Sequence, residues 1–217
     1  CVWEGQQLPD HGEVWARVWD MRVDSNTLYG RVKCETVPLL FEREITLQND
    51  RCLVSYTLTN LSERAQPYIW AWHALWDMRG LCLEIPGLKK VVPVHEDTFV
   101  GPLEKPVAWP LVNGHDLRNG DSWKGEKSTK VYICPEERVS SALLVWPEVS
   151  LEISWESDKV PYVGIWYNHG GFKGEYNVAI EPATGYYDRL DTALKRGMVS
   201  VLSSHGIERW CLQIKIK

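Results

Sequence analysis

The sequence predicts an all-β protein, a single domain built as an antiparallel β-sandwich, and three observations support this prediction. Apolar and polar residues alternate over short stretches along most of the 217 residues, as they do in strands with one buried face. Turn-forming residues interrupt these stretches at short intervals, which is typical of an antiparallel sandwich. Residues 188–195 form the one predicted helix, because Asp188 lies where an N-cap is expected and Gly197 follows its end.

The first half of the chain contains four predicted strands in series. Residues 14–23 alternate between apolar and polar side chains, and residues 27–35, 39–48 and 52–60 follow with the same period of two. The Asn49-Asp50 pair between the last two is a natural hairpin turn. These strands are therefore expected to pair as antiparallel neighbours.

The rest of the chain alternates between short strands and one long loop. Residues 93–125 are rich in Pro, Gly, Asn and Asp, which predicts a long loop of the kind that is often functional. The remaining predicted strands cover residues 66–75, 81–85, 130–134, 142–146, 151–155, 162–166, 176–180, 198–202 and 209–217.

Composition narrows the class of protein. A net charge of −5 without a basic stripe argues against a nucleic-acid partner. No apolar stretch is long enough to span a bilayer and no signal peptide opens the chain, so we expect a cytoplasmic protein without membrane association. An apolar fraction of 44% allows a substantial core.

The cysteines are scattered and none forms a C-x-x-C pair. Such cysteines on apolar strands predict buried free thiols in a cytosolic protein, and a disulfide set in a secreted protein is the alternative. The six are Cys1, Cys34, Cys52, Cys82, Cys134 and Cys211. The spacing of His95, His115 and His205 does not match that of metal ligands, so no zinc site is predicted.

Tryptophan is unusually frequent, with 12 residues against 3 phenylalanines. An indole offers a flat apolar face and one N–H donor, which suits the C–H face of a pyranose ring. The same properties suit the core of a β-sandwich. Tryptophan content therefore favours a sugar ligand only mildly.

Glu181 is the candidate catalytic carboxylate. It follows the predicted strand 176–180 and precedes Pro182, which we expect to end that strand because proline cannot donate to a sheet ladder. A carboxylate held there, beside an aromatic strand and a Gly-rich loop, lies where a sugar-handling protein would place a base. The alternative is a solvated Glu at a strand end.

Three blocks of sequence, in series, resemble a known family. They are residues 8–15, which contain a His-Gly pair; Asn60 together with residues 67–78; and residues 164–190, which contain Glu-Pro-Ala-Thr-Gly. Order and spacing of the blocks are similar to those of the galactose mutarotase-like superfamily, which includes the aldose 1-epimerases. The resemblance implies a β-supersandwich and covers nearly the whole chain. Further N-terminal strands of that family are expected to lie upstream of Cys1.

The resemblance implies an acid–base pair. Glu181 takes the place of the base and His73 that of the acid, and neither metal nor organic cofactor is needed. Interconversion of anomers requires a base for the anomeric hydroxyl and an acid for the ring oxygen, and a Glu and a His suit this. Without the resemblance, a His among tryptophans is expected to be a core residue.

The resemblance also implies substrate-binding residues. His11 is expected to bind sugar hydroxyls, with Arg17 flanking it, and Asp116 lies where the family places a sugar-binding Asp. Trp72 and Trp166 are candidates for stacking on the sugar ring. The alternatives are a surface His11, a solvated Asp116 and core packing for each Trp.

The function predicted is that of an aldose 1-epimerase acting on a free hexose, with a small-molecule sugar as partner and either a monomer or a dimer as the oligomeric state. One alternative is a non-catalytic carbohydrate-binding or sugar-sensing domain, which would need no acid–base pair. Another is a hexose-phosphate 1-epimerase, which would need clustered arginines for the phosphate. Arg17, Arg43 and Arg189 are scattered in the sequence and do not support that variant.

Overall fold

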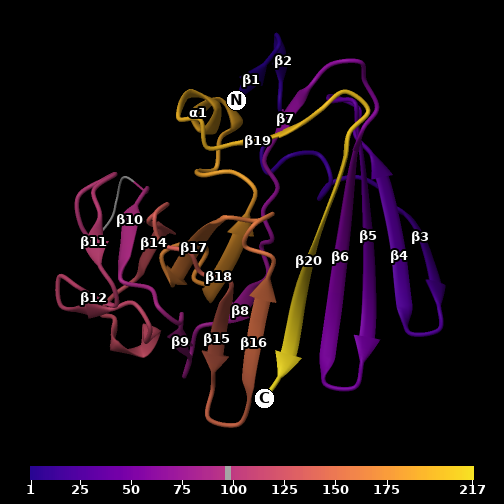
Figure 1. The fold of residues 1–217 in the computed structure, drawn as a ribbon. Helices are drawn as coiled ribbons and strands as arrows, with labels where there is room; N and C mark the ends of the chain where they lie inside the picture. The colour runs from indigo at the N-terminus through magenta and orange to yellow at the C-terminus, as the bar shows by residue number, and fades with distance from the viewer. Residues whose placement is uncertain (96–98) are drawn as a thin grey trace.

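Two large antiparallel sheets pack against each other across one apolar core (Figure 1). The computed structural model describes residues 1–95 and 99–217. The all-β prediction is confirmed, since one short helix accompanies the sheets in the described chain.

The larger sheet has eight strands, and most of them are joined by hairpins. Its spatial order is β3 (Asp20–Asp24), β4 (Thr27–Lys33), β5 (Leu39–Gln48), β6 (Arg51–Asn60), β20 (Ile207–Ile216), β16 (Ser150–Trp155), β15 (Ser141–Val145) and β9 (Cys82–Glu84). The turn predicted between β5 and β6 is confirmed, because Gln48 pairs with Arg51 and Asn49 has a φ of +50°.

The smaller sheet has six strands and carries the residues discussed below. Its order is β11 (Val107–Ala108), β10 (Lys90–Pro93), β14 (Lys127–Ile133), β17 (Tyr162–His169), β18 (Tyr176–Ala183) and β8 (Leu75–Asp77). Three two-stranded ladders and two short helical segments complete the described fold. These are β1 (Val2–Trp3) with β2 (Gln6–Gln7), β12 (Leu111–Val112) with β13 (His115–Asp116), β7 (Gln66–Tyr68) with β19 (Ser200–Leu202), the 3₁₀ turn η1 (Gly120–Ser122) and α1 (Leu190–Lys195).

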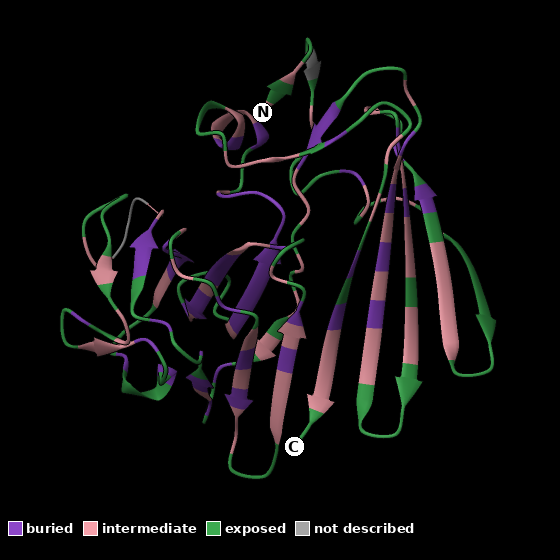
Figure 2. Cartoon of the chain, in the orientation of Figure 1, coloured by how far each residue is buried: buried purple, intermediate pink, exposed green. Residues whose placement is uncertain are grey.

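Alternation along β14, β17 and β18 gives the six-stranded sheet one apolar and one polar face. Val131, Ile165 and Ile180 pair laterally and are at most 1% exposed, and all three belong to the core between the sheets. Because successive strand residues point to opposite faces, the residues between them point away from that core. Figure 2 shows β17 and β18 as largely buried strands within a chain whose loops are mostly exposed.

Aromatic side chains fill much of the core. Trp210 is 1% exposed, and its ring centroid lies 5.1 Å from that of Trp70 and 5.7 Å from that of Tyr56. Phe41 stacks on Tyr56 at 5.7 Å. Aromatic pairs at these separations add about 0.5–1.5 kcal/mol beyond the area they bury. Much of the tryptophan content therefore serves packing.

Two sequence predictions near the chain start and in the long loop are wrong. Residues 14–19 are not a strand; instead the Trp19 indole donates to the Val14 carbonyl oxygen at 2.8 Å and packs on Phe41, so β3 begins at Asp20. The loop predicted over 93–125 contains β11, β12, β13 and η1, although part of it, residues 96–98, lies outside the described residues.

The helix starts later than its sequence suggests. Its N-cap is Arg189, which makes no side-chain capping hydrogen bond, and Asp188 is engaged elsewhere. Gly197 follows the C-terminus with a φ of +66°, as predicted. No helix in residues 1–95 and 99–217 has the length and apolar character needed to cross a membrane.

All six cysteines are free thiols. Cys34 and Cys134 are buried, and burial raises the pKa of both thiols. Cys211 is exposed, so the prediction of uniformly buried thiols is wrong for that residue.

Candidate active site

Glu181 lies inside β18 rather than at its end. Pro182 pairs with Val163 in the ladder between β17 and β18, and the strand continues to Ala183. The Pro182 carbonyl oxygen accepts a hydrogen bond from the Trp72 N–H at 3.0 Å. The nitrogen of Pro182 points to the same side of the strand, toward residues 70–72, where the ladder is already interrupted and no donor from Pro182 is needed. The prediction that Pro182 ends the strand is therefore wrong.

His73 lies directly across from Glu181. Ala71 bridges Ala183 and Leu75 pairs with Ala179, and the register between them places His73 opposite Glu181 on the same face. His73 Nε2 lies 3.2 Å from Glu181 Oε1. The His73 side chain is 42% exposed and the Glu181 side chain 3%, so the pair connects the buried sheet face to solvent.

The second oxygen of Glu181 is held by a lysine. Lys130 Nζ lies 2.6 Å from Glu181 Oε2 and 2.6 Å from Asp188 Oδ1. The Tyr132 hydroxyl also donates to Asp188 Oδ1, at 3.0 Å. Lys130 is 9% exposed, and a lysine is rarely so buried unless it is paired. The four side chains form one polar cluster on the face that points away from the core.

Gly164 makes room for this cluster. It pairs with Tyr132 on one side and Glu181 on the other. A Cβ at Gly164 would lie 3.2 Å from Lys130 Cε and 3.3 Å from Glu181 Oε2. Any larger residue would press against the Lys130–Glu181 pair.

The electrostatics give the two partners opposite charge states. Burial raises the pKa of Glu181, but the neighbouring His73 and the Lys130 charge outweigh it and hold the pKa below its usual value. The Glu181 carboxylate, 3.2 Å from His73 Nε2, raises the pKa of His73. Near neutral pH, Glu181 is therefore a carboxylate, the form a base needs, and His73 is more readily protonated, the form an acid needs.

Trp166 lies on the same face of the sheet as Glu181. It pairs laterally with Lys130 and with Ala179, so its side chain projects beside the Lys130 side chain. It is partly exposed, and its ring lies 5.9 Å from His95 in an edge-to-face arrangement. Trp166 is the predicted aromatic that the structure places beside the candidate site.

Trp72 lies on the other face. It alternates with His73 and packs against the core, where its ring centroid lies 6.2 Å from that of Trp76. The structure therefore places this side chain with the core residues, the alternative that sequence reasoning left open.

His11 and Arg17 lie in the N-terminal segment and make contacts within it. His11 is an exposed residue with a φ of +59°, and its ring lies 5.6 Å from Trp15. Arg17 pairs with Glu13 at 3.2 Å and with Glu35. In the described part of the chain, neither residue forms a hydrogen bond or ion pair with Glu181 or His73, so their roles in sugar binding stay predictions.

The Asp116 carboxylate is paired with a neighbouring arginine. Arg118 donates to both of its carboxylate oxygens, at 3.0 Å and 2.8 Å, and lowers the pKa of the Asp116 carboxyl. Its backbone oxygen accepts from the Trp123 indole at 3.0 Å. These contacts stabilise the β12–β13 hairpin. The role of Asp116 in sugar binding stays a prediction.

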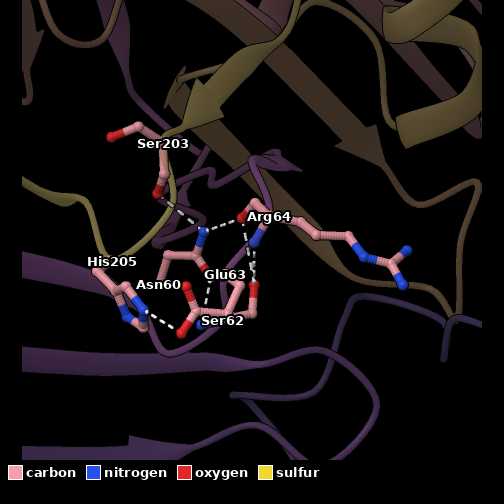
Figure 3. Close-up of polar contacts among 6 residues, drawn as sticks. All are labelled: Asn60, Ser62, Glu63, Arg64, Ser203 and His205. Atoms are coloured by element: carbon pink, nitrogen blue, oxygen red, sulfur yellow. Dashed lines mark hydrogen bonds and ion pairs between the residues drawn. The ribbon is translucent and has the colours of Figure 1, made fainter.

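Asn60, from the second sequence block, holds two loops together (Figure 3). Its amide nitrogen donates to the backbone oxygens of Arg64 at 2.6 Å and Ser203 at 2.9 Å, and its Oδ1 accepts from Ser62. Asn60 is 1% exposed. This pattern is that of a structural side chain.

Metal-binding side chains do not gather anywhere in the described chain. Within residues 1–95 and 99–217, no three His, Cys, Asp or Glu side chains lie close enough together to hold a metal ion.

Comparison with solved structures identifies the fold. A provisionally assigned aldose 1-epimerase from Escherichia coli K12 superposes with a TM-score of 0.75 at 14% identity, over 100% of this chain and 78% of that one. A galactose mutarotase related enzyme from Lactobacillus acidophilus gives 0.72 at 13% identity, over 99% and 76%. A galactose mutarotase-like protein from Lactobacillus casei gives 0.67 at 17% identity, over 97% and 76%. The chain has the galactose mutarotase-like fold. No protein-family model matches it, and no curated protein matches its sequence.

Sequence patterns do not assign three residues to this candidate site. They place Lys130 at the start of a strand, give Tyr132 no role, and predict Asp188 as a helix cap. The position of Lys130 next to the buried apolar run 131–134 is the signal that points to it, because a buried lysine needs a carboxylate partner. Its partners are 51 and 58 residues away, which periodicity alone does not reveal.

Proposed function

We propose that the protein is an aldose 1-epimerase-type isomerase that interconverts the α and β anomers of a hexose. The observation that supports it most is the contact between Glu181 Oε1 and His73 Nε2, a base and an acid side by side at an accessible sheet face. The anomeric hydroxyl oxygen and the ring oxygen are bonded to the same carbon. A pair of groups at neighbouring positions can therefore serve both oxygens.

The proposed reaction moves two protons and breaks one bond. Glu181 Oε1 takes the proton of the anomeric hydroxyl while protonated His73 gives its Nε2 proton to the ring oxygen. The bond between the anomeric carbon and the ring oxygen breaks, and the anomeric carbon becomes an aldehyde. Rotation about the C1–C2 bond and the reverse proton transfers close the ring as the other anomer. Each transfer group typically contributes about 10²–10⁴-fold.

Binding of the ring is assigned in this proposal to Trp166. Trp166 is the lateral neighbour of Lys130 on the side of the sheet that carries Glu181, and its indole is of the type on which a pyranose ring stacks. The family resemblance predicts roles for His11 and Asp116, Arg17 is predicted because it flanks His11, and Trp72 is predicted as a stacking aromatic. The contacts described above do not add support for these four residues.

Within residues 1–95 and 99–217, the arginines weighed for a phosphate site do not favour a phosphorylated substrate over a free sugar. Arg17 is paired with two carboxylates, Arg189 with Asp191 at 2.7 Å, and Arg43 lies over the Trp19 ring at 4.7 Å. A phosphate would have to displace such partners to gain a bidentate contact.

Optical rotation of freshly dissolved α-D-glucose and α-D-galactose tests the proposal. We expect the wild type to accelerate the approach to equilibrium, and Glu181→Gln and His73→Asn each to remove that acceleration. Trp fluorescence on sugar titration provides a separate binding readout. Sugar binding without acceleration for either sugar would replace the proposal with a carbohydrate-binding domain.

A further inference from the structure

The two oxygens of the Glu181 carboxylate have different surroundings. Oε2 accepts from the Lys130 ammonium at 2.6 Å, whereas His73 Nε2 lies 3.2 Å from Oε1. Among the described residues, no donor makes a hydrogen bond of good geometry to Oε1, although that atom is itself buried. A buried oxygen without a full set of hydrogen-bond donors lowers the stability of the fold, so its presence calls for a functional explanation.

Lys130 is itself held in place from the other side. Asp188 Oδ1 lies 2.6 Å from the lysine nitrogen and also accepts from Tyr132. Both carboxylates lie 2.6 Å from the same nitrogen, so the two accepting oxygens are no more than about 5 Å apart. The ammonium is thus fixed between a buried carboxylate and a half-exposed one, whose side chain is 56% exposed.

The backbone immediately before Asp188 adopts an unfavourable conformation. Tyr187, the residue before it, has a φ of +74°, which bulky side chains rarely adopt. Arg196 lies over the Tyr187 ring at 4.4 Å and pairs with Glu104 at 2.7 Å, which holds that ring in place. Strained backbone that the surroundings maintain is concentrated at functional sites. This observation is independent of the Lys130 contacts.

We propose that Lys130, secured by Asp188, is a positioning residue for Glu181: it fixes Oε2 and leaves Oε1 as the atom that takes the substrate proton. This inference rests on the proposed function and adds to it the residues that orient the base. Without this contact the carboxylate would be free to turn partway about its Cγ–Cδ bond, which would move Oε1 away from His73. Lys130 restricts that rotation, so one oxygen, Oε1, remains beside the acid.

The charged and titratable groups around Glu181 make the proposal testable by pH. They are His73 from the segment before β8, Lys130 from β14 and, through Lys130, Asp188 and Tyr132; β17 contributes uncharged residues at this face. Removal of the positive charge raises the pKa of a carboxylate, and removal of a neighbouring negative charge lowers it. Lys130→Met and Asp188→Asn must therefore act in opposite directions.

The first experiment is the pH profile of kcat/KM for anomer interconversion. We expect its acidic limb to move up by about one pH unit or more in Lys130→Met and down by a few tenths of a unit in Asp188→Asn. Asp191→Asn is the matched control, because Asp191 pairs with Arg189 and does not contact Lys130 or Glu181. An acidic limb of the kcat/KM profile that lies at the wild-type pH in both Lys130→Met and Asp188→Asn would overturn the proposal.

A second readout separates this proposal from the proposed function. The carboxyl ¹³C resonance of Glu181 is titrated by NMR in the folded wild type, in Lys130→Met and in Asp188→Asn, and needs no activity. Opposite shifts of the Glu181 pKa in an inactive protein would support the positioning of the carboxylate and reject the epimerase. Because Asp188 is half-exposed, Asp188→Asn retains a folded protein even where Lys130→Met unfolds. An unchanged Glu181 pKa in folded Asp188→Asn would contradict the proposal.

Discussion

Two buried carboxylates, Glu13 and Glu181, lie in different regions of the molecule and have different surroundings. Glu13 joins the N-terminal segment to the connection between β4 and β5: it accepts from the backbone N–H groups of Glu35 at 2.7 Å and Thr36 at 2.8 Å and pairs with Arg17. Glu181 pairs with Lys130 through one oxygen and meets half-exposed His73 with the other.

Burial and pKa do not distinguish the two. The Glu13 side chain is 5% exposed and that of Glu181 3%, and the pKa of each lies below its usual value despite the opposing effect of burial. The difference lies in the partners. Both oxygens of Glu13 are bound to donors that hold two segments together, whereas Oε1 of Glu181 faces a titratable side chain open to solvent. A buried carboxylate is a candidate for chemistry when its hydrogen bonding is incomplete on the accessible side.

The largest effect is expected from Glu181→Gln. An amide cannot take the proton of the anomeric hydroxyl, so anomer interconversion should fall by about 10²–10⁴-fold. Glu13→Gln provides the comparison and should retain the wild-type rate per folded molecule. Polarimetry on both variants measures this, and a comparable loss in Glu13→Gln would remove the distinction between the two carboxylates.

His73→Asn should show the next largest effect. The amide keeps a hydrogen-bond donor but cannot deliver a proton, so we expect a loss of about 10²-fold or more in kcat/KM. Because the His73 pKa is raised above that of a free imidazole, the wild-type rate should fall only as pH rises through that raised pKa. A wild-type alkaline limb that persists unchanged in His73→Asn would assign the acid to another group.

Glu13→Gln should instead reduce stability. The two backbone N–H groups lose a charged acceptor and Arg17 loses a partner, which should lower the free energy of unfolding by about 1–3 kcal/mol. A carboxyl whose folded-state pKa is lowered stabilises the fold above its unfolded pKa, and this is lost as pH falls through the folded value. The difference in unfolding free energy between wild type and Glu13→Gln should therefore shrink below about pH 4.5, measured by urea unfolding. A constant difference would contradict this role.

Gly164→Ala should have the smallest effect of the four. Its Cβ would press on Lys130 and Glu181 at 3.2–3.3 Å, and overpacking of this kind costs about 1–3 kcal/mol. Gly30→Ala is the matched control, because its Cβ would meet Trp19 at 3.0 Å in the other sheet. We expect thermal denaturation to show a lower Tm for both variants and polarimetry to show a lower rate for Gly164→Ala alone. Equal rates in the two variants would mean that the Lys130–Glu181 pair tolerates displacement.

Local pattern predicted the fold well where the interactions are local. The bounds of β5 match the prediction, and the hairpin between β5 and β6 forms at Asn49 and Asp50. Residues 14–19 show the limit of this approach, because their alternation is the same as that of a strand but Trp19 bonds to Val14 and packs on Phe41.

The sequence indicates Glu181 by its place between a predicted strand and Pro182, whereas His73 is assigned a role only through the family resemblance. The two residues are 108 positions apart, and their contact depends on a register that no single segment encodes. Lys130 and Asp188 were missed because their roles depend on long-range charge pairing. The prediction that Pro182 ends its strand is wrong because a proline is tolerated where its nitrogen faces a segment that needs no donor. The sequence of one strand does not show which segment lies beside it.

Exchange NMR on an equilibrium mixture of the α and β anomers of glucose and galactose tests the central claim most directly, because it reports ring opening without a net change in composition. The account predicts that wild-type protein adds exchange cross-peaks between the two anomeric protons of at least one sugar. Glu181→Gln should remove them, while Glu13→Gln, compared at equal folded concentration, should preserve them. Cross-peaks that persist in Glu181→Gln would contradict the account, as would their absence with wild-type protein for every aldose tested.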